Sequence, residues 1–226
     1  MRKGFAVLIL ASASLASMQA HAAAIVGLDN TGQPGVDRAD MNWTLSDGGP
    51  AYVSIDGVYP VGSAWLANDA TSAWLTPTRN QGDSLDPSVN GSYVYSLAFD
   101  LTGFHADTAS FTGRFLVDNQ VSSITLNGNT IFTGPAGGFT ASNWTNFGSS
   151  NGFVKGLNVL QINAVNLAQN SGNPAGLRVE FIDSSVAAVP EPATWALMMA
   201  GFGLTGFAMR RRTRPQVKTN VSYAAA

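Results

Sequence analysis

Apolar and polar residues alternate over much of the chain between Ala23 and Ser185, and this pattern predicts β-strands. In segment 92–100 every second residue is aromatic or aliphatic, so that one face carries Tyr93, Tyr95, Leu97 and Phe99. Successive side chains of a strand point to opposite faces, so a period of two indicates a strand with one buried face. Further strands are expected at 110–118, 122–126, 130–132, 159–166 and 176–183.

Turn-forming sequences separate these segments. Asn127-Gly128 lies between two expected strands and favours a tight hairpin, because both residues accept a positive φ. Other turn signals are Asp47 to Pro50, Asp86-Pro87, Asn90-Gly91, Gly134-Pro135, Asn151-Gly152 and Asn173-Pro174. No convincing helical pattern precedes residue 193. The sequence therefore predicts an all-β body over residues 23–186, an antiparallel β-sandwich of about eight strands, with Ser184–Val189 as a short linker.

The N-terminus has the organisation of a secretory signal. Two basic residues precede an apolar run from Phe5 to Leu10, and small residues follow. Ala20 and Ala22 flank His21 in the small-x-small arrangement that signal peptidase recognises. We therefore expect residues 1–22 to direct the chain to the Sec machinery and to be removed after Ala22.

The C-terminal tail, residues 187–226, has three consecutive parts. Pro190, Glu191 and Pro192 form a stiff extended segment, since proline fixes φ and disfavours helix in the preceding residue. The next 17 residues, Ala193–Met209, carry no charge and predict a single transmembrane helix of about 26 Å. Arg210, Arg211 and Arg212, within a basic end at 210–214, are expected to stop the helix on the cytoplasmic side.

Charge and cysteine content narrow the classes of function. Charged residues make up 12% of the chain, and residues 23–189 carry five basic against thirteen acidic side chains, a net charge of −8. A body of this charge repels a phosphate backbone, which argues against nucleic acid as a partner. Cysteine is absent, which excludes a disulfide framework, a cysteine-ligated zinc or iron–sulfur site and a cysteine nucleophile.

The tail resembles the PEP-CTERM sorting domain of exported proteins in Gram-negative bacteria. The resemblance rests on Val189–Leu197, on Gly201–Leu204 and on the arginine cluster, in that order along the chain. It implies recognition by an exosortase, an intramembrane protease-transpeptidase that cuts near Pro-Glu-Pro. It also implies a transient stay in the inner membrane, then a cell-surface or extracellular location associated with exopolysaccharide and biofilm.

The body, over roughly residues 90–182, resembles the jelly roll of galactose-binding-like domains and carbohydrate-binding modules. The fragments that carry this resemblance are Val117–Asn119, Leu126–Gly128 and the Gly-x-Asn-x-Leu run that ends at Leu160. The resemblance implies a jelly-roll β-sandwich. It implies an activity less strongly, because such folds host many functions.

Tryptophans are the best candidates for binding a sugar. A flat indole packs on the apolar face of a sugar, while amide and carboxylate groups bind its hydroxyls. Trp43 and Trp144 are equally consistent with sugar binding and with core packing, whereas Trp65 and Trp74, each beside a leucine, favour the core. The polar candidates that accompany the tryptophans are Asn143, Asp118 and Asn119.

A structural calcium ion is a further expectation. Calcium takes six to eight oxygen ligands from carboxylates and carbonyls. Asp29, Asp37 and Asp40 lie in one glycine-containing segment, and Glu180 in the expected last strand completes a candidate set. Solvated turn aspartates are the alternative interpretation. No other cofactor is expected.

Catalysis has little support in the sequence. Glycoside hydrolysis needs two carboxylates about 5 to 9 Å apart, and nothing in the spacing pairs Glu180 with Asp100. His105 is the one histidine of the body and follows Gly103-Phe104 in an expected turn, where a histidine is more often solvated than catalytic. We therefore expect a non-catalytic surface or matrix protein that binds extracellular polysaccharide. The alternatives are a self-associating structural protein and, with less support, a glycoside hydrolase.

Overall fold

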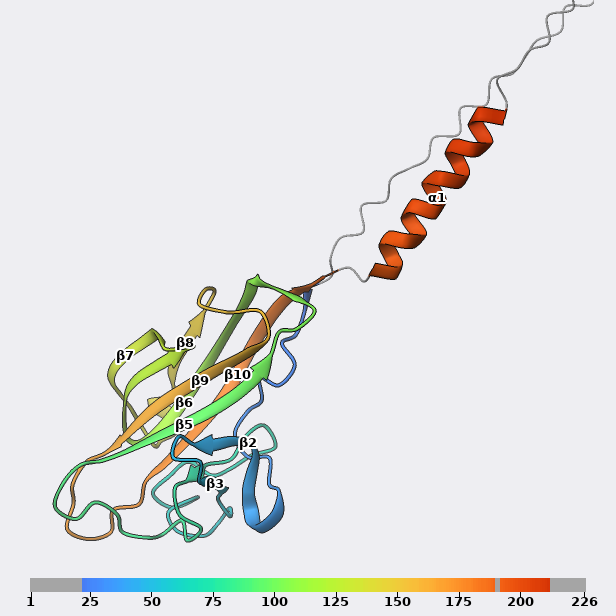
Figure 1. Cartoon of the computed structure of the whole chain (residues 1–226). Coiled ribbons are helices and arrows are strands. Elements are labelled where there is room, and N and C mark those ends of the chain that lie inside the picture. The colour runs from blue at the N-terminus through green and yellow to red at the C-terminus, as the bar shows by residue number, and fades with distance from the viewer. Residues whose placement is uncertain (1–21, 190–191, 212–226) are drawn as a thin grey trace, which may run out of the picture. The chain divides into compact units, whose positions relative to one another are not determined.

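The computed structural model describes residues 22–189 and 192–211, and the chain divides into two compact units between Ala188 and Val189 (Figure 1). The described strands of the first unit are β1 (Ala22–Ala23), β2 (Ala39–Leu45), β3 (Pro50–Val53), β4 (Leu75–Thr76), β5 (Gly91–Asp100), β6 (Phe104–Leu126), β7 (Asn129–Gly138), β8 (Thr145–Ser149), β9 (Leu157–Asn166) and β10 (Gly176–Ala188). Two single-turn 3-10 helices, η1 (Val36–Arg38) and η2 (Ala141–Asn143), lie between strands. The second unit contains helix α1 (Pro192–Arg211).

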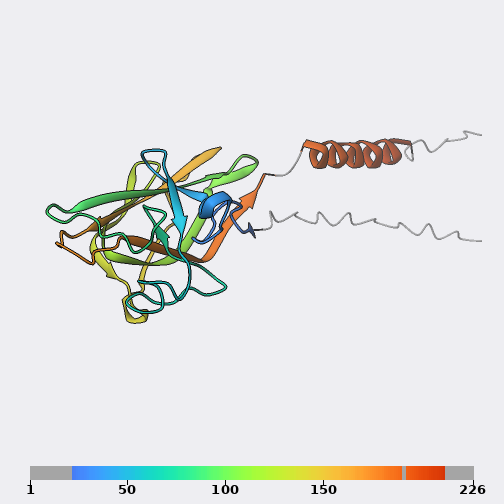
Figure 2. The ribbon, with the colours of Figure 1, turned by 90° about the horizontal axis from the view of Figure 1, so that it is seen from below.

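Hydrogen bonds join most of these strands into a closed circuit. Its order is β10, β4, β3, β2, β5, β9, β6 and back to β10, and every pairing between these strands is antiparallel. The two ribbon views show the strands surrounding a common interior (Figures 1 and 2). The expectation of an all-β antiparallel body is confirmed, and the architecture is a barrel-like sandwich.

Strand β6 closes this circuit, because it pairs with both β9 and β10. Its 23 residues pair with β8 and β10 over the first half and with β7 and β9 over the second half. The sequence predicts two separate strands here, at 110–118 and 122–126. They form one strand because the chain does not turn between them. It changes its pairing partners at an irregularity around Val121.

The interior is apolar and rich in phenylalanine. The inward faces of β5 and β9 supply fully buried side chains such as Leu97 and Leu160, as the alternation predicts. Phe111 lies at the centre of an aromatic group, with ring centroids 5.7 Å from Phe147, 5.9 Å from Phe153 and 5.5 Å from Phe181. These rings meet edge to face, the arrangement that the charge distribution of aromatic rings favours.

A second, smaller apolar cluster covers the outer face of β6 at Leu116. Val61, Trp65 and Trp74 pack there, and the two indole centroids lie 4.5 Å apart. All three residues lie in the long connection between β3 and β4. The prediction that Trp65 and Trp74 belong to a core is confirmed.

The segment expected to be a linker is part of the last strand. β10 continues to Ala188, with Ala187 opposite His105 and Ala188 opposite Phe104 on β6. Its other edge pairs with β1, Ala23 opposite Val186. The linker prediction for Ser184–Val189 is wrong, because backbone pairing to two neighbours extends this strand without an apolar alternation.

Helix α1 forms where the uncharged segment predicts a helix, and it includes Pro192, Arg210 and Arg211. Among the described residues, no helix is both long enough and apolar enough to cross a membrane, so the span expected over 193–209 is not found. Residues 1–21 of the signal segment, including Ala20, lie outside the described residues, as do Pro190, Glu191 and Arg212, whereas Ala22 begins β1.

Candidate functional site

A hollow lies on the molecule where β6 is flanked by β8 on one side and β10 on the other. Its volume is about 640 Å³. Exposed polar side chains and one apolar side chain line it: Thr112, Asn146, Ser150, Ile182 and Asp183. Phe111 and Phe147 lie beneath it, with their side chains buried in the core. We call this hollow the β6 groove.

A bulge in β10 determines one wall of the β6 groove. Phe181 lies opposite Gly113 and Asp183 opposite Thr112, so Ile182 is an extra residue in β10. A bulge of this kind breaks the strict alternation of side chains between faces. Ile182 is 63% exposed, and the neighbouring Asp183 is exposed as well, instead of returning to the interior. Alternation alone could not have identified this pair.

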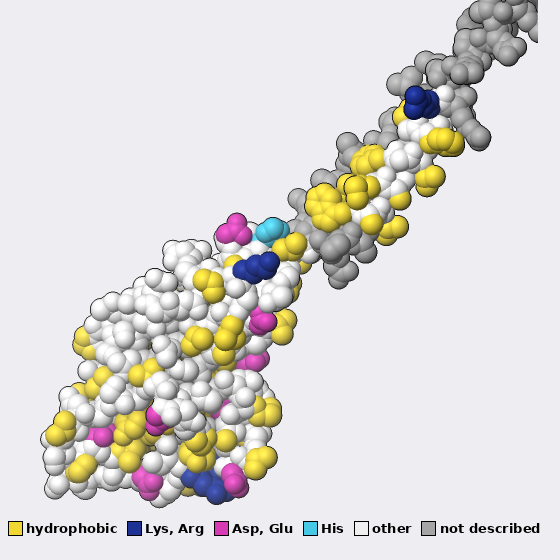
Figure 3. Space-filling model, in the orientation of Figure 1, with side chains coloured by type: hydrophobic (Ala, Val, Ile, Leu, Met, Phe, Trp, Pro, Cys, Tyr) yellow, Lys and Arg dark blue, Asp and Glu magenta, His cyan; other side chains and the backbone are white. Residues whose placement is uncertain are grey.

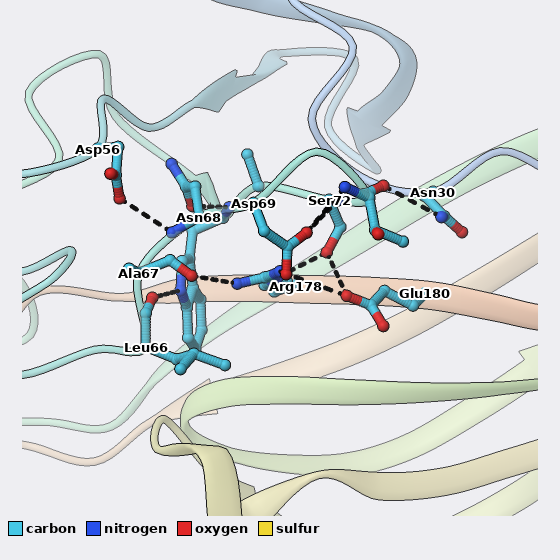
Figure 4. A network of polar contacts seen from close by, with 12 residues as sticks. Asn30, Asp56, Leu66, Ala67, Asn68, Asp69, Ser72, Arg178 and Glu180 are labelled. Carbon is cyan, nitrogen blue, oxygen red and sulfur yellow. Dashed lines mark hydrogen bonds and ion pairs between the residues drawn. The ribbon is translucent and has the colours of Figure 1, made fainter.

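Next to the groove, a buried arginine organises a polar network (Figure 4). Arg178 is fully buried, and its guanidinium binds Asp69 at 2.7 Å, Glu180 at 3.3 Å and the Ala67 carbonyl at 2.6 Å. Its Nε also donates to Ser72 Oγ at 2.6 Å. The network fixes the loop of residues 66–72 onto β10.

Glu180 receives donors from both sides. Ser72 Oγ donates to its Oε1 at 2.7 Å, and Arg114 donates to its Oε2 at 2.7–2.8 Å. Burial raises the pKa of Asp69, but the backbone N–H groups of Thr71 and Ser72, together with Arg178, outweigh burial and lower that pKa below its ordinary value. The positive charges of Arg114 and Arg178 balance the negative charges of Asp69 and Glu180, which offsets the cost of removing the buried charges from water.

Trp144 lies between this network and the second apolar cluster. The Arg114 guanidinium carbon is 4.3 Å from the indole centroid, and that of Arg178 is 5.5 Å away. The ring also packs partly buried against the second cluster. Cation–π contact and packing therefore occupy much of the indole that the sequence offered as a sugar platform.

The other predicted sugar-binding residues make hydrogen bonds within the protein. Trp43 is fully buried, and its Nε1 donates to the Asp29 carbonyl at 2.9 Å, so its assignment to a sugar-binding surface is wrong. Asn143 accepts hydrogen bonds from the backbone N–H and hydroxyl of Thr140. Asn119 accepts one from the Leu167 N–H. In each case the polar group satisfies the protein's own backbone or side chains.

Asp118 is buried beneath the second apolar cluster. Trp65 Nε1 donates to its Oδ2 at 2.8 Å, and Asn119 Nδ2 donates to its Oδ1 at 2.8 Å. Burial raises the pKa of Asp118 to about 6, although the Trp65 hydrogen bond opposes the shift.

This raised pKa predicts a loss of stability with rising pH. Between about pH 4 and 6 the unfolded chain releases the Asp118 proton while the folded chain keeps it, so folding is disfavoured by about 3 kcal/mol once the pH exceeds 6. Below pH 4 both states are protonated and the cost vanishes. Urea unfolding at pH 4, 5, 6 and 7 should show this decrease in the wild type and not in Asp118→Asn. An identical pH profile for Asp118→Asn and for the exposed control Asp47→Asn would contradict it.

The predicted calcium ligands are not brought together. Asp40 accepts hydrogen bonds from the backbone N–H groups of Gly32, Gln33, Asn42 and Trp43, and Asp37 pairs with Arg79 at 2.7 Å. Glu180 is occupied by the arginine network. Over residues 22–189 and 192–211, no three histidine, cysteine, aspartate or glutamate side chains form a group that could hold a metal ion.

The residues considered for catalysis also have structural surroundings. The hydroxyl and the N–H of Thr102 donate to Asp100 at 2.7 Å and hold its pKa below the ordinary value. Glu180 binds two arginines and a serine. Asp100 and Glu180 therefore each bind groups of the protein itself, and neither is among the residues that line the β6 groove.

Comparisons with known proteins found one family match, in the tail, and similar solved structures. Residues 188–212 match the PEP-CTERM protein-sorting motif. Among solved structures, a family 35 carbohydrate-binding module from an environmental isolate is 19% identical, over 46% of this chain and 76% of that chain, with a TM-score of 0.25. The family 35 module of Cellvibrio japonicus Abf62 is 12% identical, over 66% of this chain and 98% of that chain, with a TM-score of 0.29. No match was found among curated proteins.

Proposed function

We propose that this is an exported protein whose C-terminus is sorted by an exosortase and whose body binds carbohydrate without catalysing a reaction. The observation that carries the proposal is the sorting motif at residues 188–212. The secretory pattern of the N-terminus supports export independently. The body then works at the cell surface or outside the cell, in a matrix of exopolysaccharide such as that of a biofilm.

The end of β10 supports processing at this motif. β10 stops at Ala188, so a single residue, Val189, separates the folded body from Pro190. Cleavage near Pro-Glu-Pro therefore removes nothing from the strand circuit.

Intact-mass spectrometry of the exported protein tests the sorting step. In a host with a matching exosortase, we expect a mature chain that begins at Ala23 and has lost the sequence after Pro-Glu-Pro. Glu191→Ala should retain the tail to residue 226, whereas Lys218→Ala, in the extension after the arginines, should be processed normally. A wild-type chain that keeps residue 226 would overturn the proposal.

The β6 groove supports carbohydrate binding by the body. Hydroxyl, amide and carboxylate groups line it beside the exposed Ile182, which suits a ligand with both hydroxyls and apolar C–H groups. The visible face of the body is mostly neutral, with scattered charges (Figure 3). Native-gel retardation in polysaccharide-containing gels tests binding, with Asn146→Ala as the disrupting variant. Equal mobility with and without every polysaccharide would remove this part of the proposal.

A further inference from the structure

A second hollow lies on the other side of the β10 bulge. Its volume is about 440 Å³, and its lining includes Asp29, Gln33 and Thr71 together with Ile182 and Asp183. The last two residues also line the β6 groove. The bulge is therefore a ridge between two adjacent hollows, one toward β6 and β8 and one toward the N-terminal segment. We call the second one the N-terminal hollow.

Direct hydrogen bonds hold the N-terminal segment beside β10. The Phe181 N–H donates to Asn30 Oδ1 at 2.6 Å, and the Ile25 N–H donates to Ser184 Oγ at 3.0 Å. These bonds lie on either side of the bulge. They fix the far wall of the N-terminal hollow relative to the ridge, as a preformed binding surface requires.

The charged residues that line the two hollows favour some classes of polysaccharide over others. Asp183 is the charged residue in the lining of the β6 groove, and Asp29 and Asp183 are those of the N-terminal hollow; neither lining contains a lysine or arginine. A uronate or sulfate group would meet carboxylates without a cation to neutralise it. Like charges at close range are unfavourable, so the surface disfavours polyanions.

We infer that the two hollows form one extended site for a neutral, linear polysaccharide that crosses the Ile182–Asp183 ridge. This inference rests on carbohydrate binding by the body, as proposed above. Ile182 packs on the apolar face of the sugar at the ridge, and Asp183 accepts its hydroxyls. Asn146 and Thr112 bind sugars on one side, and Gln33 binds sugars on the other. The chain is thus recognised along its length rather than at its end.

Affinity electrophoresis of the purified body, residues 23–189, tests this site once its cooperative unfolding has been verified. The probes are mixed-linkage β-glucan, galactomannan and dextran as neutral polymers, and alginate and polygalacturonate as anionic ones. We expect retardation by at least one neutral polymer and by neither polyanion. Asn146→Ala and Gln33→Ala should each weaken binding about fivefold to tenfold through lost hydrogen bonds. Asn129→Ala, an exposed asparagine at the start of β7, is the matched control and should bind as wild type.

Oligosaccharides of two to eight residues, prepared from the retarding polymer, complete the test by calorimetry. Affinity should rise with length until the ligand reaches both hollows. Retardation by a polyanion, a disaccharide that binds as tightly as an octasaccharide, or a Gln33→Ala variant with wild-type affinity would overturn the two-hollow site while leaving carbohydrate binding intact. Failure of every polymer would instead remove carbohydrate binding itself, and this inference with it.

Discussion

Replacement of Arg178 by methionine should lower the free energy of unfolding by about 3–5 kcal/mol. The side chain is fully buried, and its guanidinium neutralises Asp69 and Glu180 and also binds Ser72 and the Ala67 carbonyl. Methionine fills much of the volume but leaves the buried Glu180 with one cation fewer. The loop of residues 66–72 loses its attachment to β10 at the same time.

Denaturant unfolding measures this loss, and a second arginine provides the control. Arg79 pairs with Asp37 at the same distance, 2.7 Å, but the two side chains are 58% and 67% exposed. Water screens this pair, so Arg79→Met should change the free energy of unfolding by less than about 1 kcal/mol. Equal effects of the two substitutions would show that the buried network does not stabilise the fold.

Trp43→Ala should be of comparable severity, at about 3–5 kcal/mol, because it leaves a large cavity in the interior. The Trp43 side chain has no exposed area, and its Nε1 holds the Asp29 carbonyl. Thermal or denaturant unfolding measures the effect. Met41 on the same strand is 67% exposed, so Met41→Ala should stay within about 0.5 kcal/mol of wild type. A Trp43→Ala variant as stable as Met41→Ala would restore the surface role that burial excludes.

Local features of the fold could be predicted from the sequence. The alternation in 92–100 predicts the buried face of β5, and Asn127-Gly128 predicts the turn between β6 and β7, where the two residues have φ values of 51° and 80°. Both features depend on residues close in sequence. The intrinsic preferences of those residues therefore suffice to define them.

Features that depend on distant contacts could not be predicted. Arg178 alternates with inward-facing Leu177 and Val179, which places it on the outer face, but the loop of residues 66–72 covers it there and makes it a core residue. Trp144 is partly exposed beside Arg114, whereas Trp43 is fully buried in the interior, and no local pattern distinguishes the two. The bulge at Ile182 depends on the register with β6, which no local pattern encodes.

The pairing of β1 with the end of β10 places both ends of the body at one pole. The chain enters and leaves the fold at neighbouring points, with Ala22 opposite Ala187. The 13 residues of β10 span about 40 Å, so the connection between β9 and β10 lies far from both ends. A tether at either extremity would therefore be attached at the same pole of the body, opposite the connection between β9 and β10.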